Sequence, residues 1–170
     1  MPRLLLTLTV ALVVIAGCGG GDDSSKNGGG GQALSQQDFV AEANKICRQG
    51  SAKINDKARE VQQKLQGKSI GEQQKVVADV LQETAKEYDP YLARLHDLHP
   101  PQDISAEWTK FLAGIDKAFE LIPDLADATR DGDRDKLSAL TTQFSQIAGD
   151  TRPFAEKYKL DDCLPDESTS

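Results

Sequence analysis

The chain has 170 residues, and its 20 lysine and arginine residues against 27 aspartate and glutamate residues give a formal net charge of −7 at pH 7. Such an acidic surface repels nucleic-acid phosphates and anionic lipid head groups, so we expect no nucleic-acid partner and no membrane contact through a basic face.

The first 17 residues are expected to be an export signal. Arg3 is the only charge there, and the run 4–16 that follows holds apolar residues and threonines only. At about 13 residues this run fits a signal peptide and is too short for a membrane span. The tetrapeptide Ile15-Ala16-Gly17-Cys18 resembles a bacterial lipobox, which implies cleavage before Cys18 and a lipid (diacylglyceryl, with palmitate-like chains) on its sulfur. Ordinary secretory cleavage after the small pair is the alternative.

Residues 18–34 are expected to form a flexible tether rich in glycine, serine and aspartate. No apolar side chain is present between Gly19 and Gly31, so this stretch has nothing to bury and maximal backbone freedom. A flexible coil of this length reaches about 20–25 Å. The domain that follows is therefore expected to stand near a membrane without being pressed onto it.

The chain has three cysteines, an odd number for an exported protein. If Cys18 carries the lipid, Cys47 and Cys163 remain, and they can pair in an oxidising compartment. The alternative is a buried free thiol at Cys47, which falls on the apolar face of its predicted helix.

Two helices are predicted in the first half of the domain. The first begins at Ser35, whose hydroxyl can cap the helix, and ends at Gly67. The second runs from Ile70 to Leu98, with a kink at Pro90. The first helix has apolar residues at intervals of three and four, the pattern of an amphipathic helix: Phe39, Ala43, Ile46, Cys47, Ile54, Ala58, Val61 and Leu65.

Two more helices complete the prediction. The third runs from about Ser105 to Gly132 with a bend at Pro123, and the fourth from a cap at Asp133 to about residue 158 with a possible bend at Pro153. Because the connections are short, neighbouring helices should be antiparallel. The expected fold class is all-α: an up-down-up-down four-helix bundle over residues 35–163, followed by a disordered tail, 164–170.

The chain resembles small helical lipoproteins of high-GC Gram-positive bacteria. The resemblance is carried by the lipobox, the polar tether, the segments Phe39…Ala43-Asn44-Lys45-Ile46-Cys47 and Leu95…Leu98-His99-Pro100-Pro101, and the late cysteine. It implies a location at the outer face of the cell membrane and a helical architecture. The resemblance implies no particular activity.

Motifs for catalysis or cofactor binding are weak. His96 and His99 stand three residues apart on a predicted helix, a spacing that two metal ligands can use, but polar residues at a helix end explain them equally well. The run 131–135 faintly resembles a calcium loop, although a turn and a helix cap account for every residue in it. The expectation is a protein that is not an enzyme and has no catalytic residue, metal or cofactor.

Two functions remain as hypotheses. The first is a non-enzymatic interaction module of the cell envelope, which would contact an unknown envelope protein through an exposed patch or groove at Tyr91 and Phe111, residues slightly off the main apolar stripes. The second is a carrier or sensor that binds a small apolar ligand between the helices. It predicts a cavity of a few hundred cubic ångströms near the proline bends.

Overall fold

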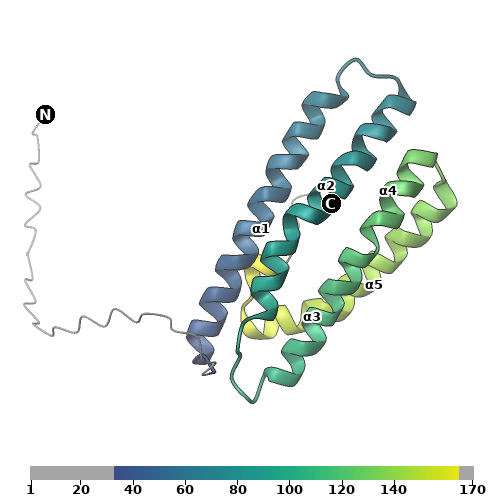
Figure 1. The fold of residues 1–170 in the computed structure, drawn as a ribbon. Coiled ribbons are helices and arrows are strands. Elements are labelled where there is room, and N and C mark those ends of the chain that lie inside the picture. Colours follow the sequence, from purple (N-terminus) through teal and green to yellow (C-terminus); the bar gives the residue numbers. More distant parts are fainter. Residues whose placement is uncertain (1–32, 165–170) are drawn as a thin grey trace, which may run out of the picture. The chain divides into compact units, whose positions relative to one another are not determined.

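The structure is a computed structural model that describes residues 33–164, and these residues belong to one compact unit. The expected signal segment, Cys18, the tether up to residue 32 and the tail from residue 165 lie outside the described residues. Figure 1 shows the elements in chain order: α1 (Gln36–Leu65), α2 (Ile70–His96), α3 (Ser105–Glu120), α4 (Ile122–Asp131), α5 (Arg134–Tyr158) and the short 3₁₀ helix η1 (Asp161–Cys163). The described residues contain no strand, which confirms the all-helical fold class.

Side-chain caps define the starts of three helices. The backbone N–H of Asp38 donates to the hydroxyl of Ser35 at 3.2 Å, and the N–H of Lys136 donates to the carboxylate of Asp133 at 3.0 Å. Both caps were predicted from the sequence, because these side chains satisfy N–H groups that have no partner within a helix. Ser69 begins α2 in the same way, with Glu72 completing a capping box.

The predicted third helix is two helices, which corrects the sequence interpretation. Leu121 ends α3 and begins α4, and Pro123 occupies the first turn of α4. A proline has no N–H to donate, and its ring collides with the carbonyl four residues earlier, so the helix cannot continue through this position unchanged. The other two prolines of the prediction, Pro90 and Pro153, lie inside helices that continue past them.

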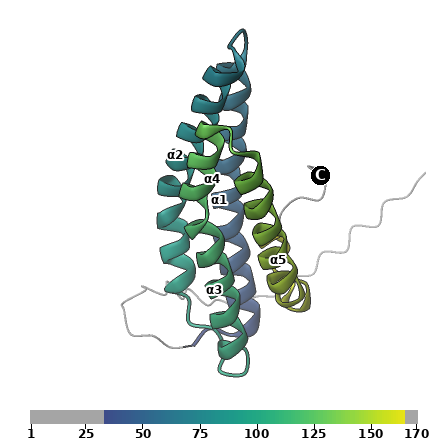
Figure 2. The same cartoon turned by 90° about the vertical axis from the view of Figure 1, so that its right-hand side faces the viewer.

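The helices pack on one another in a defined set of pairs. α1 packs on α2, α2 on α4, α3 on α5 and α4 on α5, while η1 lies against α1. Figure 2 shows α4 between α2 and α5, with α3 continuing in line below it. The groove described below forms where α3 and α5 lie side by side.

The hydrophobic core lies where the first half of α1 meets the end of α2, α3 and the end of α5. Its largest fully buried side chains are Phe39, Ile46, Leu95, Ile104 and Leu160. The compact unit contains this whole core and both paired cysteines, so we expect it to fold without the segment that precedes it. Among the described residues, no helix is both long enough and apolar enough to cross a membrane.

The apolar stripe predicted along α1 is buried only in its first half. Ala43 and Cys47 are buried, whereas Ile54 is 40% exposed and Ala58 is exposed. The reason is that the main neighbours of α1 are α2 and η1, and η1 reaches only the first half. The folded part also begins slightly earlier than predicted, since the N–H of Leu34 donates to the carbonyl of His99 at 2.8 Å.

Candidate functional site

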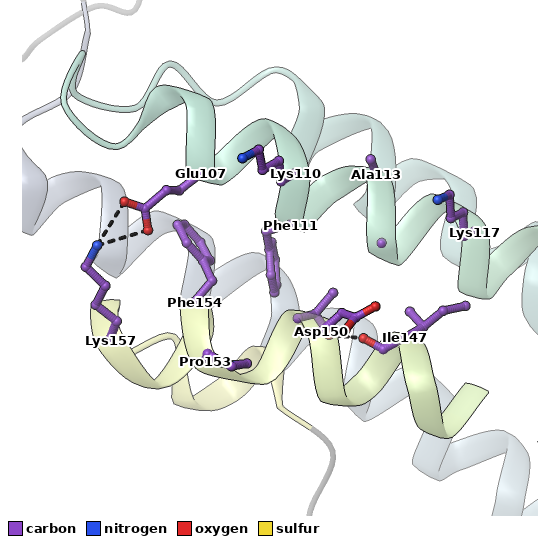
Figure 3. Close-up of a pocket in the computed structure, with 12 residues that line it drawn as sticks. Glu107, Lys110, Phe111, Ala113, Lys117, Ile147, Asp150, Pro153, Phe154 and Lys157 are labelled. Atoms are coloured by element: carbon purple, nitrogen blue, oxygen red, sulfur yellow. Dashed lines mark hydrogen bonds and ion pairs between the residues drawn. The ribbon is translucent and has the colours of Figure 1, made fainter. Parts of the chain in front are cut away.

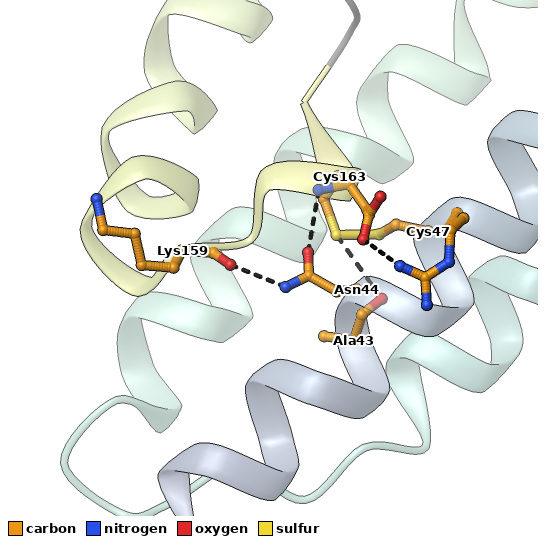
Figure 4. Close-up of a disulfide and its surroundings, with 7 residues drawn as sticks. Ala43, Asn44, Cys47, Lys159 and Cys163 are labelled. Carbon is orange, nitrogen blue, oxygen red and sulfur yellow. Dashed lines mark hydrogen bonds and ion pairs between the residues drawn. A yellow bond between two sulfur atoms is a disulfide. The ribbon is translucent and has the colours of Figure 1, made fainter. Parts of the chain in front are cut away.

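The predicted pairing of Cys47 with Cys163 is present in the structure. Their sulfurs are 2.07 Å apart and their Cα atoms 5.0 Å apart, across 116 positions of sequence. Figure 4 shows the bridge between α1 and the C-terminal turn that carries η1. The disulfide therefore joins the first helix of the domain to its last described segment.

Asn44 holds the same C-terminal turn by hydrogen bonds, and the sequence analysis did not identify this role. Its side-chain amide donates to the carbonyl of Lys159 at 2.8 Å, and its carbonyl oxygen accepts from the N–H of Asp162 at 3.0 Å (Figure 4). Lys159 is the only non-glycine residue among those described with a positive φ, 58°. The available signal was the position of Asn44, one helical turn before Cys47 on α1.

Of the predicted patch or groove at Tyr91 and Phe111, Phe111 lies in a groove and is not part of an exposed patch. Phe111 is only 3% exposed, and its ring lies 5.3 Å from that of Trp108 and 5.1 Å from that of Phe154. Tyr91 is partly buried and contacts the ring of Tyr88 instead. Phe111 is buried because α3 is covered on two sides, by the core and by α5, so its apolar face is wider than a single stripe.

A groove of about 580 Å³ lies between α3 and α5. Figure 3 shows the rings of Phe111 and Phe154 side by side within it. The apolar groups that line it come from both helices: Phe111, Ala113, Gly114, Ile147, Pro153 and Phe154. A volume in this range suits a small organic ligand.

Gly114 allows α3 and α5 to approach closely beneath this groove. A Cβ atom at this position would lie 2.4 Å from Cγ2 of Thr151, which is far inside van der Waals contact. The sequence contained a glycine at mid-helix, a position where glycine is unfavourable, but the packing partner that explains it could not be read from α3 alone.

An ion pair closes one end of the groove. The amine of Lys157 donates to both carboxylate oxygens of Glu107, at 2.8 and 2.9 Å. The hydrogen bond from Lys157 lowers the pKa of Glu107, and the same bond is the main reason that the pKa of Lys157 is raised to about 12. Both groups therefore carry their charges at neutral pH.

A second groove, of about 490 Å³, lies on another side of α3 and contains the two histidines. Nε2 of His96 is 2.9 Å from a carboxylate oxygen of Asp116, and Nδ1 of His99 is 2.8 Å from the carbonyl of Asp97. His96 of α2 is therefore paired with a carboxylate of α3, and His99 with a backbone carbonyl two residues earlier. Across residues 33–164, no group of three or more His, Cys, Asp or Glu side chains is arranged to hold a metal ion.

The run 131–135 forms a turn and a helix cap in the structure. Gly132 ends α4 with a φ of 69°, a left-handed conformation that glycine adopts without strain. Asp133 then caps α5 through its carboxylate.

Comparison of the chain with protein-family models, with curated proteins and with solved structures finds no match.

Proposed function

We propose that this chain is an exported lipoprotein, anchored at the outer face of the cell membrane by a lipid on Cys18. The support is the N-terminal pattern that ends at Cys18, together with the pairing of the two remaining cysteines. Disulfides persist in oxidising, extracytoplasmic compartments, so the pair is consistent with export.

The anchor is tested by Cys18→Ala in the expressing cell. This change is expected to release the protein from the membrane fraction and to leave precursor that retains the signal segment. A Cys18→Ala protein that is fully processed and still carries lipid would overturn the proposal. Cleavage of the unchanged chain without lipidation would favour ordinary secretion.

The arrangement we propose for the domain is an up-down-up-down bundle in which α3 and α4 together make the third segment. Short connections between α1 and α2 and between α4 and α5 support it, as does the packing of α2 on α4 and of α3 on α5.

We infer that the domain is a non-enzymatic carrier or sensor for a small apolar ligand. The groove between α3 and α5 carries this proposal, because its volume suits such a ligand and two aromatic rings line it. It lies beside Pro153, one of the predicted bends. Phe111 lines this groove, whereas Tyr91, the other residue predicted for a patch or groove, does not.

The charges of the groove favour binding over acid–base catalysis. A general acid or base works best when its pKa lies near the working pH. The hydrogen bonds between Glu107 and Lys157 lower the pKa of the carboxyl group and raise that of the amine, so both pKa values move away from neutral pH. They are suited to hold a fixed charge distribution at the end of the groove.

Native mass spectrometry of residues 32–170, after exposure to an envelope lipid extract, tests this function. A stoichiometric adduct is expected, and Ala113→Phe should abolish it because Ala113 is an exposed residue that lines the groove. Ala113 also lines the groove that contains the histidines, so Thr109→Phe, at an exposed residue of that groove alone, should leave the adduct in place. The matched control is Ala139→Phe, an exposed alanine of α5 that does not line this groove. An apo mass for the unchanged chain, or an adduct unaffected by Ala113→Phe, would overturn the assignment.

A second candidate function is the interaction module for an envelope protein. The observation that favours it is the open side of the groove, along which a partner segment could lie against Phe111 and Phe154. An apo mass, combined with crosslinks from the groove to another envelope protein, would select this function.

A further inference from the structure

The two ends of the α3/α5 groove differ in charge. Figure 3 shows Glu107 and Lys157 at one end, Lys110 farther along α3 above Phe111, and Lys117, Asp150 and Ile147 toward the other end. At the first end, Glu107 and Lys157 neutralise one another through two hydrogen bonds, which leaves the amine of Lys110 as the net charge beside them. At the second end, the charges of Lys117 and Asp150 are of opposite sign and offset one another.

Lys110 forms no ion pair within 4 Å in the described part of the chain, although the protein as a whole carries a surplus of acidic residues. Glu107, the carboxylate one turn earlier on α3, is occupied by Lys157 and also accepts from the hydroxyl of Tyr158 at 3.4 Å. Lys110 is exposed and lines the groove, so its three N–H donors are accessible to a ligand in the groove.

The groove beyond Lys110 is apolar and elongated. Lys110 and Lys117 are two helical turns apart on α3, about 10 Å along the helix axis. Figure 3 shows Phe111 and Ala113 between Lys110 and Lys117, and both are apolar. A ligand that matches this arrangement has an anionic group at one end and a hydrocarbon chain of about 10 Å or longer.

We propose that the α3/α5 groove binds a single-chain anionic amphiphile, with its head group at Lys110 and its hydrocarbon chain along Phe111 toward Ile147. The proposal rests on the small-ligand function inferred above and specifies the class of that ligand. A charge-assisted hydrogen bond at Lys110 selects the anionic head group, and burial of methylene groups supplies most of the affinity.

Trp108 provides a direct measurement of this binding. It is the only tryptophan of the chain, and its ring stacks on that of Phe111, which lines the groove. Residues 32–170 are titrated with dodecanoate and, separately, with dodecyltrimethylammonium, each below the concentration at which it self-associates. A saturable change in Trp108 fluorescence is expected with dodecanoate, and at least about tenfold weaker binding with the cationic amphiphile.

Two charge-reversal variants locate the head group. Lys110→Glu is expected to weaken dodecanoate binding by about tenfold or more, whereas Lys117→Glu, the same change two turns away, is expected to alter it by less than about threefold. Both lysines are exposed, so neither change should disturb the fold, and circular dichroism checks this. Equal affinity for the two amphiphiles, or equal effects of the two variants, would overturn the head-group assignment.

The outcomes separate this inference from the proposed function. If dodecanoate does not bind but a lipid-extract adduct sensitive to Ala113→Phe is present, the groove is a carrier site and the anionic-amphiphile proposal is wrong. If dodecanoate binds and Ala113→Phe has no effect on it, the ligand lies elsewhere, and both the groove assignment and this proposal are wrong. Binding that is lost in Ala113→Phe and weakened in Lys110→Glu supports both.

Discussion

Removal of the Cys47–Cys163 disulfide is expected to destabilise the domain by about 5 kcal/mol. The two cysteines are 116 positions apart, and the bond restricts the unfolded chain far more than the folded one. For a loop of this length the chain-entropy model gives about 16 cal/mol/K, or about 4.8 kcal/mol at 25 °C. An unfolding entropy of about 0.27 kcal/mol/K for a domain of this size converts this value to a fall in Tm of about 15–20 °C.

The assay compares thermal unfolding of residues 32–170, followed by circular dichroism, in three forms: oxidised, reduced, and carrying Cys47→Ala with Cys163→Ala. Reduction retains both side chains, so it isolates the cross-link, whereas the double variant also removes buried volume at Cys47, which is 4% exposed. The reduced form should therefore show most of the loss and the double variant slightly more. A fall of less than about 5 °C in the reduced form, with both thiols shown to be free, would refute the entropic argument.

Three further changes probe other contacts. Asn44→Ala removes two hydrogen bonds to the C-terminal turn and should lower the unfolding free energy by about 1–3 kcal/mol in urea titrations; an unchanged midpoint would mean that the disulfide alone holds the turn. Gly114→Ala should lower the unfolding free energy by about 1–2 kcal/mol, because the new Cβ would lie 2.4 Å from Cγ2 of Thr151. Adding Thr151→Ser, which removes that methyl group, should restore most of this stability in the double variant. If the double variant is not rescued, the loss comes from another contact. The hydrogen bond from Lys157 should hold the pKa of Glu107 below its ordinary value. The stabilisation from this pair is therefore complete above the ordinary carboxyl pKa and is lost as the pH falls through the lowered pKa. In an NMR titration Lys157→Met should raise the pKa of Glu107, and equal pKa values in the two proteins would contradict the assignment.

Local sequence chemistry predicted the helices well where a single neighbour decides the structure. Ser35 and Asp133 cap their helices because a side-chain oxygen meets the N–H three residues later, which the sequence specifies directly. The disulfide could also be predicted from the sequence, since the assignment of Cys18 to the lipid left only two cysteines to pair.

The sequence was less informative where a second helix decides the outcome. Pro123 lies beside a helix break, but Pro90 and Pro153 lie inside helices that continue, and the same local rule applies to all three. Phe111 was assigned to an exposed patch or a groove because it lies off the main stripe of α3, and the pairing with α5 is what makes it a buried groove residue. Ile54 was assigned to the core because its spacing is regular, although only α2 accompanies that half of α1.

The sequence analysis named one residue of the candidate groove, Phe111, as a site residue but could not identify the helix that faces it. Lys110 and Phe111 belong to α3, and Phe154 belongs to α5, so the site exists only once these two helices are paired. The carrier hypothesis placed its cavity near the bends at Pro90 and Pro123, whereas the groove lies beside Pro153. What the sequence analysis lacked was the identity of the facing helix, which depends on long-range packing.

The position of the disulfide also determines how the domain would carry a mechanical load. A pulling force between Leu34 and Leu164 would pass along the first part of α1 to Cys47, cross the sulfur–sulfur bond and leave through Cys163. The residues between the two cysteines form a closed covalent loop outside this path, so tension on the ends would not unravel them. Oxidised, the chain could extend only by its first helical turns; reduced, it would extend through every helix from α1 to α5.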